Sequence, residues 1–115
     1  MSLKPDFADQ SILVTGAARG LGKSMAMRLA ECGARVGLID VDEAGCRATA
    51  DELRAGGARA EHFAADVSRR EELLAAAASF ARASGRIDAV INNAMLLRYE
   101  PVEKGTEDVL ARMTG

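Results

Sequence analysis

Three glycines separate a short apolar run from an amphipathic stretch in the segment TGAARGLG, residues 15–22. Glycine in a helix costs about 1 kcal/mol relative to alanine, so three of them at one turn need a compensating role. Gly16 would permit a tight turn, Gly20 would leave backbone amides uncovered, and Gly22 would let a helix lie close to a sheet. The free amides at a helix N-terminus attract anions, and a pyrophosphate fits there. The alternative is a glycine-rich turn without a ligand.

An acidic residue, Asp40, ends the next apolar run, ARVGLID, about 20 residues after the glycines. A carboxylate there would accept hydrogen bonds from the hydroxyls of an adenosine ribose and would repel a 2′-phosphate. A close like-charge contact costs about 1 kcal/mol in water and roughly 4 kcal/mol near a protein surface. A repulsion energy of this size between Asp40 and the 2′-phosphate would favour NAD over NADP by about tenfold or more. The alternative is a solvated aspartate at the start of a helix.

Arg19, inside the glycine segment, favours the opposite cofactor, because a guanidinium could pair with a 2′-phosphate. The residue after Asp40 is Val41, so no second cation supports that pairing. We therefore predict NAD, and NADP stays as the alternative.

The segments that must position these residues alternate between short apolar runs and amphipathic stretches. Strands are expected within 11–16, 34–40, 59–67 and 87–94. Strands that alternate with helices of ten to sixteen residues predict right-handed crossovers and a parallel sheet. The fold class is therefore α/β, a doubly wound Rossmann sheet with strand order 3-2-1-4.

Three helices connect these strands. The first is expected from Leu21 to Gly33, and the second from an Asp42 cap to Gly56. The third is expected to open with a capping box, Ser68 to Glu71, and to close at Gly85. A last helix is expected after Thr106. The apolar faces that the spacing predicts are Leu21, Met25, Leu29 and Cys32; then Cys46, Ala50 and Leu53; then Leu73, Ala77, Phe80 and Ala81.

Composition narrows the function classes. The net charge of −2 gives no basic surface for nucleic acid, and no apolar run is long enough to span a bilayer. The N-terminus lacks the apolar segment of a secretory signal, so a cytoplasmic location is expected. The two cysteines lack metal-ligand spacing and are expected to be small buried hydrophobes. The single histidine, His62, is expected to lie on a strand or at the surface.

Four spaced segments resemble the short-chain dehydrogenase/reductase family: TGAARGLG (15–22), LID (38–40), DVS (66–68) and NNA (92–94). The resemblance covers the chain from about Phe7 to Thr114. It implies that Asp66 accepts from the adenine amino group, that the Val67 backbone completes adenine recognition, and that residues 92–94 lie beside the ribose. The cofactor-binding residues are then Thr15, Gly16, Arg19, Gly20, Leu21, Gly22, Asp40, Asp66, Val67, Asn92, Asn93 and Ala94. Without the resemblance, the DV and NNA segments could equally be a strand end and a turn.

Two departures from the family pattern limit what these residues can do. The family usually has glycine after NNA, where this chain has Met95. The family's catalytic serine and Tyr-x-x-x-Lys pair have no counterpart, because Tyr99 is the only tyrosine and Glu103 stands four residues after it. No catalytic residue is therefore assigned. Residues 1–115 are expected to be the N-terminal, dinucleotide-binding part of a single Rossmann-fold domain.

The resemblance implies hydride transfer between NAD and an alcohol or ketone in the full-length protein, with residues 1–115 inactive by themselves. Two alternatives stay open: an NADP-preferring carbonyl or oxoacyl reductase, and a non-catalytic nucleotide-binding module. The fourth strand would leave a bare sheet edge, which we expect to be covered by the rest of a longer polypeptide; the alternative is a partner, such as a second copy of this chain. A homo-oligomer is expected for the full-length protein.

Overall fold

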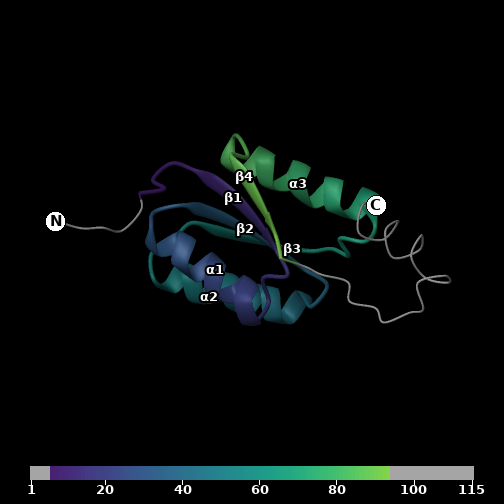
Figure 1. Cartoon of the computed structure of the whole chain (residues 1–115), viewed down its shortest axis with the longest axis horizontal. Helices are drawn as coiled ribbons and strands as arrows, with labels where there is room; N and C mark the ends of the chain where they lie inside the picture. The colour runs from purple at the N-terminus through teal and green to yellow at the C-terminus, as the bar shows by residue number, and fades with distance from the viewer. Residues whose placement is uncertain (1–5, 94–115) are drawn as a thin grey trace, which may run out of the picture.

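A parallel four-stranded sheet forms the centre of the molecule in the computed structural model, which describes residues 6–93 (Figure 1). Its order is β3-β2-β1-β4. The strands are β1 (Ser11–Thr15), β2 (Arg35–Asp40), β3 (Ala60–Ala64) and β4 (Ala89–Asn92). The predicted α/β class and the predicted 3-2-1-4 order are both confirmed.

Helices cover both faces of this sheet. In Figure 1, α1 (Gly20–Glu31) and α2 (Glu43–Ala55) lie on one face, and α3 (Arg70–Ser84) lies on the other. Because all four strands run in the same direction, the turns that follow them meet at one edge of the sheet. Ligands of doubly wound folds bind at this edge, beyond the carboxyl ends of the strands.

Two apolar clusters hold the layers together, one on each face of the sheet. Successive residues of β1 contribute to opposite clusters. Ile12 and Val14 pack with α1 and α2 on one face, whereas Leu13 packs with Phe80 of α3 on the other. Gly37 of β2 lies under the Phe80 ring, and a Cβ at this position would come within 2.7 Å of a ring carbon. The missing side chain therefore makes room for the aromatic anchor of α3.

Helix boundaries follow the predicted signals at several places. Asp42 caps α2, since its side chain accepts a hydrogen bond from the Gly45 N–H at 3.0 Å. Gly85 ends α3 in the left-handed conformation, with a φ of 90°. The helix expected after Thr106 lies outside the described residues.

The predicted apolar face of α1 is partly wrong. Leu21 is 68% exposed, and the buried residues of the helix are Gly22 and Ala26. The start of the helix approaches the preceding loop closely at Gly22, where a side chain would not fit, whereas Leu29 further along packs against the core as predicted. A prediction from hydrophobic spacing favours a leucine over a glycine, so it assigned Leu21 to the buried face instead of Gly22.

The predicted capping box at Ser68 is also wrong. The helix α3 begins at Arg70, and its N-cap residue, Arg69, forms no side-chain capping bond. The Ser68 hydroxyl donates instead to Asp66 Oδ1 at 2.7 Å. The helix begins one residue later than predicted, with Arg69 at the N-cap, so Ser68 lies outside the capping position and its hydroxyl serves the turn before the helix.

The fourth strand lies at the edge of the sheet and pairs with β1 alone among the described strands. Val90 on this strand is 56% exposed, which agrees with the bare sheet edge predicted from the sequence. None of the helices in the described part of the chain is long and apolar enough to cross a membrane.

Candidate nucleotide-binding site

The glycine segment forms the turn between β1 and α1, at the carboxyl edge of the sheet. Gly16 has a φ of 67° and Gly20 a φ of 61°, values that favour glycine. A Cβ placed on Gly20 would meet nothing within 4 Å, so the space outside this residue is open. The backbone is thus uncovered where the sequence predicts a ligand.

Gly22 permits a close approach, although its neighbours differ from those expected. A Cβ at this position would lie 1.9 Å from the Gly16 carbonyl oxygen and 2.7 Å from Asn93 Nδ2. The helix therefore closes onto its own loop and onto the segment after β4, rather than onto the flat of the sheet. Alanine cannot fit here unless backbone atoms move.

The N-terminus of α1 carries free donors. Within residues 6–93, the amides of Arg19, Gly20, Leu21 and Gly22 donate no hydrogen bond, and the first bonded amide is that of Lys23, to the Arg19 carbonyl at 3.3 Å. The first turn contains no acidic side chain to offset the positive end of the helix dipole. An anion at this helix mouth would meet several amides and no acidic side chain from the first turn of α1 itself.

Asp40, at the end of β2, lies directly against the loop. Its Oδ2 accepts the Ala18 N–H at 3.0 Å, and its Oδ1 accepts the Asp42 N–H at 3.0 Å. A carboxylate offers about four acceptor positions, so both oxygens can still receive hydroxyl groups. The side chain therefore braces the loop and also presents negative charge beside the helix mouth.

The end of β4 is tied to the end of β1. The Thr15 hydroxyl donates to Asn92 Oδ1 at 2.9 Å and accepts the Asn93 N–H at 2.9 Å. The Asn93 side-chain Nδ2 also donates to the Gly16 carbonyl at 3.4 Å. The structure thus brings the predicted residues Thr15, Asn92 and Asn93 together with the loop. Ala94, like Met95 and Tyr99, lies outside the described residues.

Asp66 and Val67 lie in the turn after β3. Asp66 Oδ1 accepts both the Ser68 hydroxyl and the Ser68 N–H, and these bonds lower the pKa of the Asp66 carboxyl below its ordinary value of 3.8. The Asp66 N–H donates to Glu72 Oε1 at 3.0 Å, which fixes the turn to α3. Asp66 is therefore ionised at neutral pH, and both of its carboxylate oxygens are acceptors.

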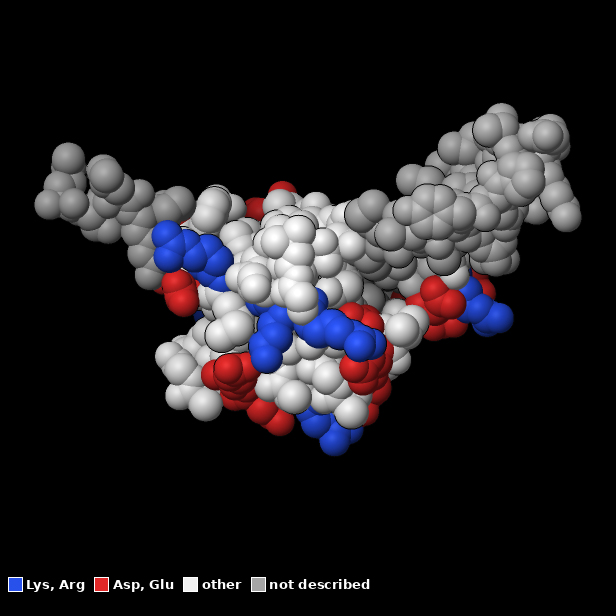
Figure 2. All heavy atoms as spheres, turned by 60° about the horizontal axis from the view of Figure 1, so that its bottom comes forward, with Lys and Arg blue, Asp and Glu red and all other residues white. Residues whose placement is uncertain are grey.

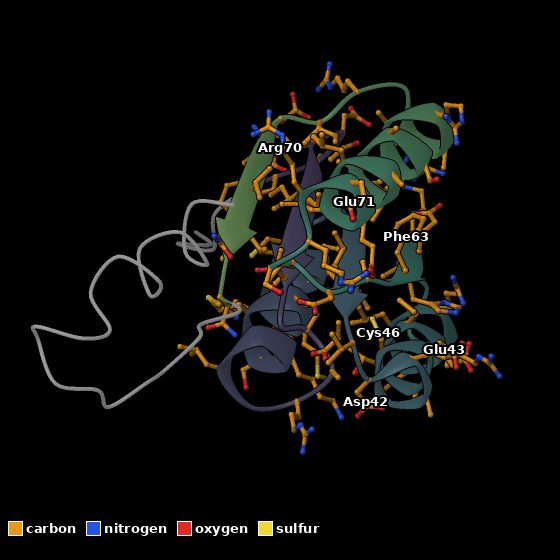
Figure 3. All side chains as sticks on the ribbon, turned by 90° about the vertical axis from the view of Figure 1, so that its right-hand side faces the viewer. Asp42, Glu43, Cys46, Phe63, Arg70 and Glu71 are labelled. Atoms are coloured by element: carbon orange, nitrogen blue, oxygen red, sulfur yellow. The ribbon has the colours of Figure 1, made fainter. Side chains whose placement is uncertain are left out.

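Cys46 is the titratable group closest to the core. In Figure 3 it lies between α2 and the sheet, whereas Phe63 lies on the α3 side. Burial raises the pKa of the Cys46 thiol to about 11, and its Sγ lies 3.3 Å from the Leu38 carbonyl oxygen. The thiol stays protonated at neutral pH and takes no part in the site.

The outer face of α1 and α2 carries charges of both signs next to one another, as Figure 2 shows. Lys23 of α1 pairs with Glu52 of α2 at 3.2 Å. Arg19, by contrast, is exposed and forms no ion pair within the described residues. Residues 6–93 contain no group of three or more metal-ligating side chains placed to hold a metal ion.

Sequence reasoning missed two polar residues that support the loops. Thr49 of α2 is buried and donates to the Ala18 carbonyl at 3.4 Å, and Glu72 of α3 holds the Asp66 turn. Thr49 shares the helical period of Cys46 and Leu53, so a polar residue on a predicted buried face was the available signal. Glu72 was overlooked because the sequence prediction assigned the capping role to Glu71, one residue earlier.

A match to a known protein family identifies the family of this chain. The family model described as short chain dehydrogenase matches residues 10–114. The chain belongs to the short-chain dehydrogenase family. The four sequence segments and the strand order therefore reflect membership of one family.

Known relatives of this short-chain dehydrogenase chain agree with that assignment. D-threitol dehydrogenase of Mycolicibacterium smegmatis is 42% identical over 94 residues, which cover 80% of this chain and 35% of that protein. L-fucose dehydrogenase of Oryctolagus cuniculus is 40% identical over 88 residues, covering 76% of this chain and 30% of that protein. The crystal structure of a dehydrogenase/reductase from Sinorhizobium meliloti has a TM-score of 0.82 at 32% identity, covering 92% of this chain and 44% of that one.

The chain thus spans about a third of the length of these curated relatives. Membership of the short-chain dehydrogenase family implies a nicotinamide dinucleotide, NAD or NADP, as cofactor. The residues fit such a group, because the Gly20 surface is open, the helix mouth has free amides, and Asp40 stands beside it.

Proposed function

We propose that the chain forms the NAD-binding part of an oxidoreductase that transfers hydride between NAD and an alcohol or ketone. The observation that carries the proposal is the helix mouth of α1, where the amides of Arg19 to Gly22 have no acceptor within the described residues. Unpaired amides at the positive end of a helix bind phosphate groups in many nucleotide-binding proteins. NAD supplies the hydride acceptor, and this chain supplies binding and orientation.

Each group of residues would take one part of the cofactor. The amides at the helix mouth would hold the pyrophosphate, and the Asp40 carboxylate would accept the ribose hydroxyls. Asp66 and the Val67 backbone would receive the adenine. Asn92 and Asn93, tied to Thr15, would line the side of the site that faces β4.

Catalysis would need residues that these 115 do not contain. A tyrosine has an ordinary pKa near 10 and needs a neighbouring cation to act as a base near neutrality. Tyr99 has Glu103 rather than lysine four residues later. We propose that residues 1–115 bind nucleotide without turnover, and that the complete enzyme is a homo-oligomer.

A preference for NADP is the second candidate, and Arg19 is the observation that favours it. The side chain is exposed and has no ion pair within residues 6–93, so it is free to pair with a 2′-phosphate. Asp40 opposes this pairing, because its negative charge would lie close to the same phosphate.

The test compares the dissociation constants of NAD and NADP in the full-length protein and in Asp40→Asn. The ratio is informative because Asp40 also braces Ala18, and loss of that brace weakens both cofactors alike. We expect the unaltered protein to prefer NAD by about tenfold or more, and Asp40→Asn to narrow the ratio.

Asp51→Asn is the matched control, because it removes one exposed negative charge of α2 that pairs with Arg54 of the same helix. It should leave the NAD to NADP ratio unchanged. If the unaltered protein binds NADP more tightly than NAD, the preference assigned to Asp40 is wrong. Arg19→Ala should then weaken NADP alone.

A further inference from the structure

The backbone of Ala18 is held from two directions. Its N–H donates to Asp40 Oδ2 at 3.0 Å, and its carbonyl accepts the Thr49 hydroxyl at 3.4 Å. We call these two contacts the Ala18 clamp. Asp40 belongs to the end of β2 and Thr49 to α2, so the clamp connects the loop to two other elements.

The clamp sets the direction of an amide at the helix mouth. In a planar trans peptide the C=O and the N–H point in opposite directions. The Ala18 carbonyl points toward Thr49, so the N–H of the same peptide unit, which belongs to Arg19, points away from α2. This N–H has no acceptor within the described residues. It is one of the donors that an anion at the helix mouth would use.

The close contact between α2 and the loop is an independent observation. A Cβ on Gly45 would lie 2.4 Å from Asp42 Oδ2 and 3.1 Å from the Ala18 Cβ. The first turn of α2 therefore needs glycine to come this near to the loop. Thr49 lies one turn later on the same side and is 1% exposed.

A simpler account of Thr49 is local. Its hydroxyl lies 3.2 Å from the Gly45 carbonyl as well, and threonine often donates to the carbonyl four residues earlier in a helix. Such a bond would satisfy the hydroxyl without any role for the loop. The two accounts differ, because only the clamp predicts a change in phosphate binding when the hydroxyl is removed.

We propose that Thr49 is a positioning residue for the cofactor: its hydroxyl orients the Ala18–Arg19 peptide so that the Arg19 N–H faces the pyrophosphate. This inference rests on the proposed function of the helix mouth. Thr49 itself touches no cofactor atom in this account and acts through the loop backbone.

The experiment measures dissociation constants for ADP-ribose, which carries the pyrophosphate, and for adenosine, which does not. The full-length protein is compared with Thr49→Val, which keeps the side-chain shape, and Thr49→Ser, which keeps the hydroxyl. Because one misdirected donor weakens an interaction modestly, we expect Thr49→Val to bind ADP-ribose about three- to tenfold more weakly. Adenosine affinity should stay within about twofold, and Thr49→Ser should restore ADP-ribose affinity to within about twofold.

Leu53→Ala is the matched control, because Leu53 is a buried residue of the same helix one turn after Thr49, and its apolar side chain cannot hydrogen-bond to the loop. It should lower the melting temperature and leave the ADP-ribose to adenosine ratio unchanged. If Thr49→Val fails to fold, Thr49→Ala removes the hydroxyl without placing a methyl group against the Ala18 carbonyl.

Three results would overturn the proposal. Unchanged ADP-ribose affinity in the folded Thr49 variant would show that the hydroxyl does not orient the loop. Equal weakening of ADP-ribose and adenosine would show a general structural effect. If the unaltered protein binds neither probe, the proposed function itself fails, and the inference fails with it.

Discussion

Asp40 and Ala18 lie 22 positions apart in sequence and are joined by a 3.0 Å hydrogen bond from the Ala18 N–H to the Asp40 carboxylate. This bond gives Asp40 a structural role besides the discrimination between cofactors that we propose for it. The residue that would select the ribose also holds the loop that would bind the pyrophosphate. In the proposed function, cofactor choice and loop geometry are therefore coupled through one side chain.

Gly20→Ala should weaken NAD binding in the full-length protein. The new Cβ meets no protein atom within 4 Å, so it would project into the space proposed for the cofactor. Alanine in the left-handed conformation also costs about 1–2 kcal/mol of stability. We expect NAD affinity, measured by calorimetry, to fall by about tenfold or more.

Gly57→Ala separates these two effects. Gly57 also has a positive φ, 92°, and open space around it, but it follows α2 far from the helix mouth. It should carry a similar stability cost and leave NAD affinity unchanged. Equal NAD affinities in the two variants would remove the argument that Gly20 keeps the backbone accessible.

Gly37→Ala should destabilise the fold through the Phe80 ring. The added Cβ would lie 2.7 Å from the ring and 2.9 Å from the Leu13 side chain, and overpacking of this kind costs about 1–3 kcal/mol. Phe80→Leu alone should also destabilise, but the two changes together should cost less than their sum. Urea unfolding of the single and double variants measures this coupling. Strict additivity would mean that Gly37 and Phe80 do not compete for space.

These cases show which parts of the structure the sequence could reveal. The Asp42 cap and the helix end at Gly85 follow local rules, because short-range spacing and backbone conformation decide them. The strand order was predictable for another reason: alternating strands and helices of these lengths build a doubly wound sheet. Gly22 was identified as a close approach, but its partners, the Gly16 carbonyl and Asn93, depend on how the loop folds back.

Helix boundaries and side-chain contacts that depend on the folded backbone could not be predicted from the sequence. The capping box failed because the helix starts one residue later, with Arg69 rather than Ser68 at the N-cap, and spacing does not fix a helix boundary to a single residue. Thr49 and Ala18 are 31 positions apart, and nothing local indicates that they meet. The α1 face was misplaced because Leu21 outweighs Gly22 in hydrophobicity, although only the glycine fits against the loop.

The Asp66 carboxyl should titrate below 3.8, and Ser68→Ala should raise its pKa toward that value. The Ser68 hydroxyl and N–H stabilise the charged form, and the substitution removes the hydroxyl. Because the folded pKa is lowered, the stabilisation is present above pH 3.8 and is lost as pH falls through the folded pKa. NMR titration of the Asp66 carboxyl carbon measures this. An unchanged titration in Ser68→Ala would contradict the assignment of the cause.

The Cys46 thiol should resist alkylation in the folded protein. Burial raises its pKa from 9.0 to about 11, so the reactive thiolate is scarce at neutral pH and the sulfur is also covered. The raised pKa contributes stability that is complete below pH 9.0 and is lost as pH rises toward about 11. Iodoacetamide labelling followed by peptide mapping, in native and urea-unfolded protein, tests the reactivity. Equal labelling rates in the two states at neutral pH would refute it.

The most direct test of the whole account is an NADH fluorescence titration of the full-length protein and of Gly22→Ala. The helix mouth requires glycine at this position, because a Cβ would lie 1.9 Å from the Gly16 carbonyl oxygen. The account predicts saturable binding by the unaltered protein and a loss of about 100-fold or more in Gly22→Ala, with circular dichroism confirming that the variant is folded. No binding by the unaltered protein, or unchanged affinity in a folded Gly22→Ala variant, would contradict it.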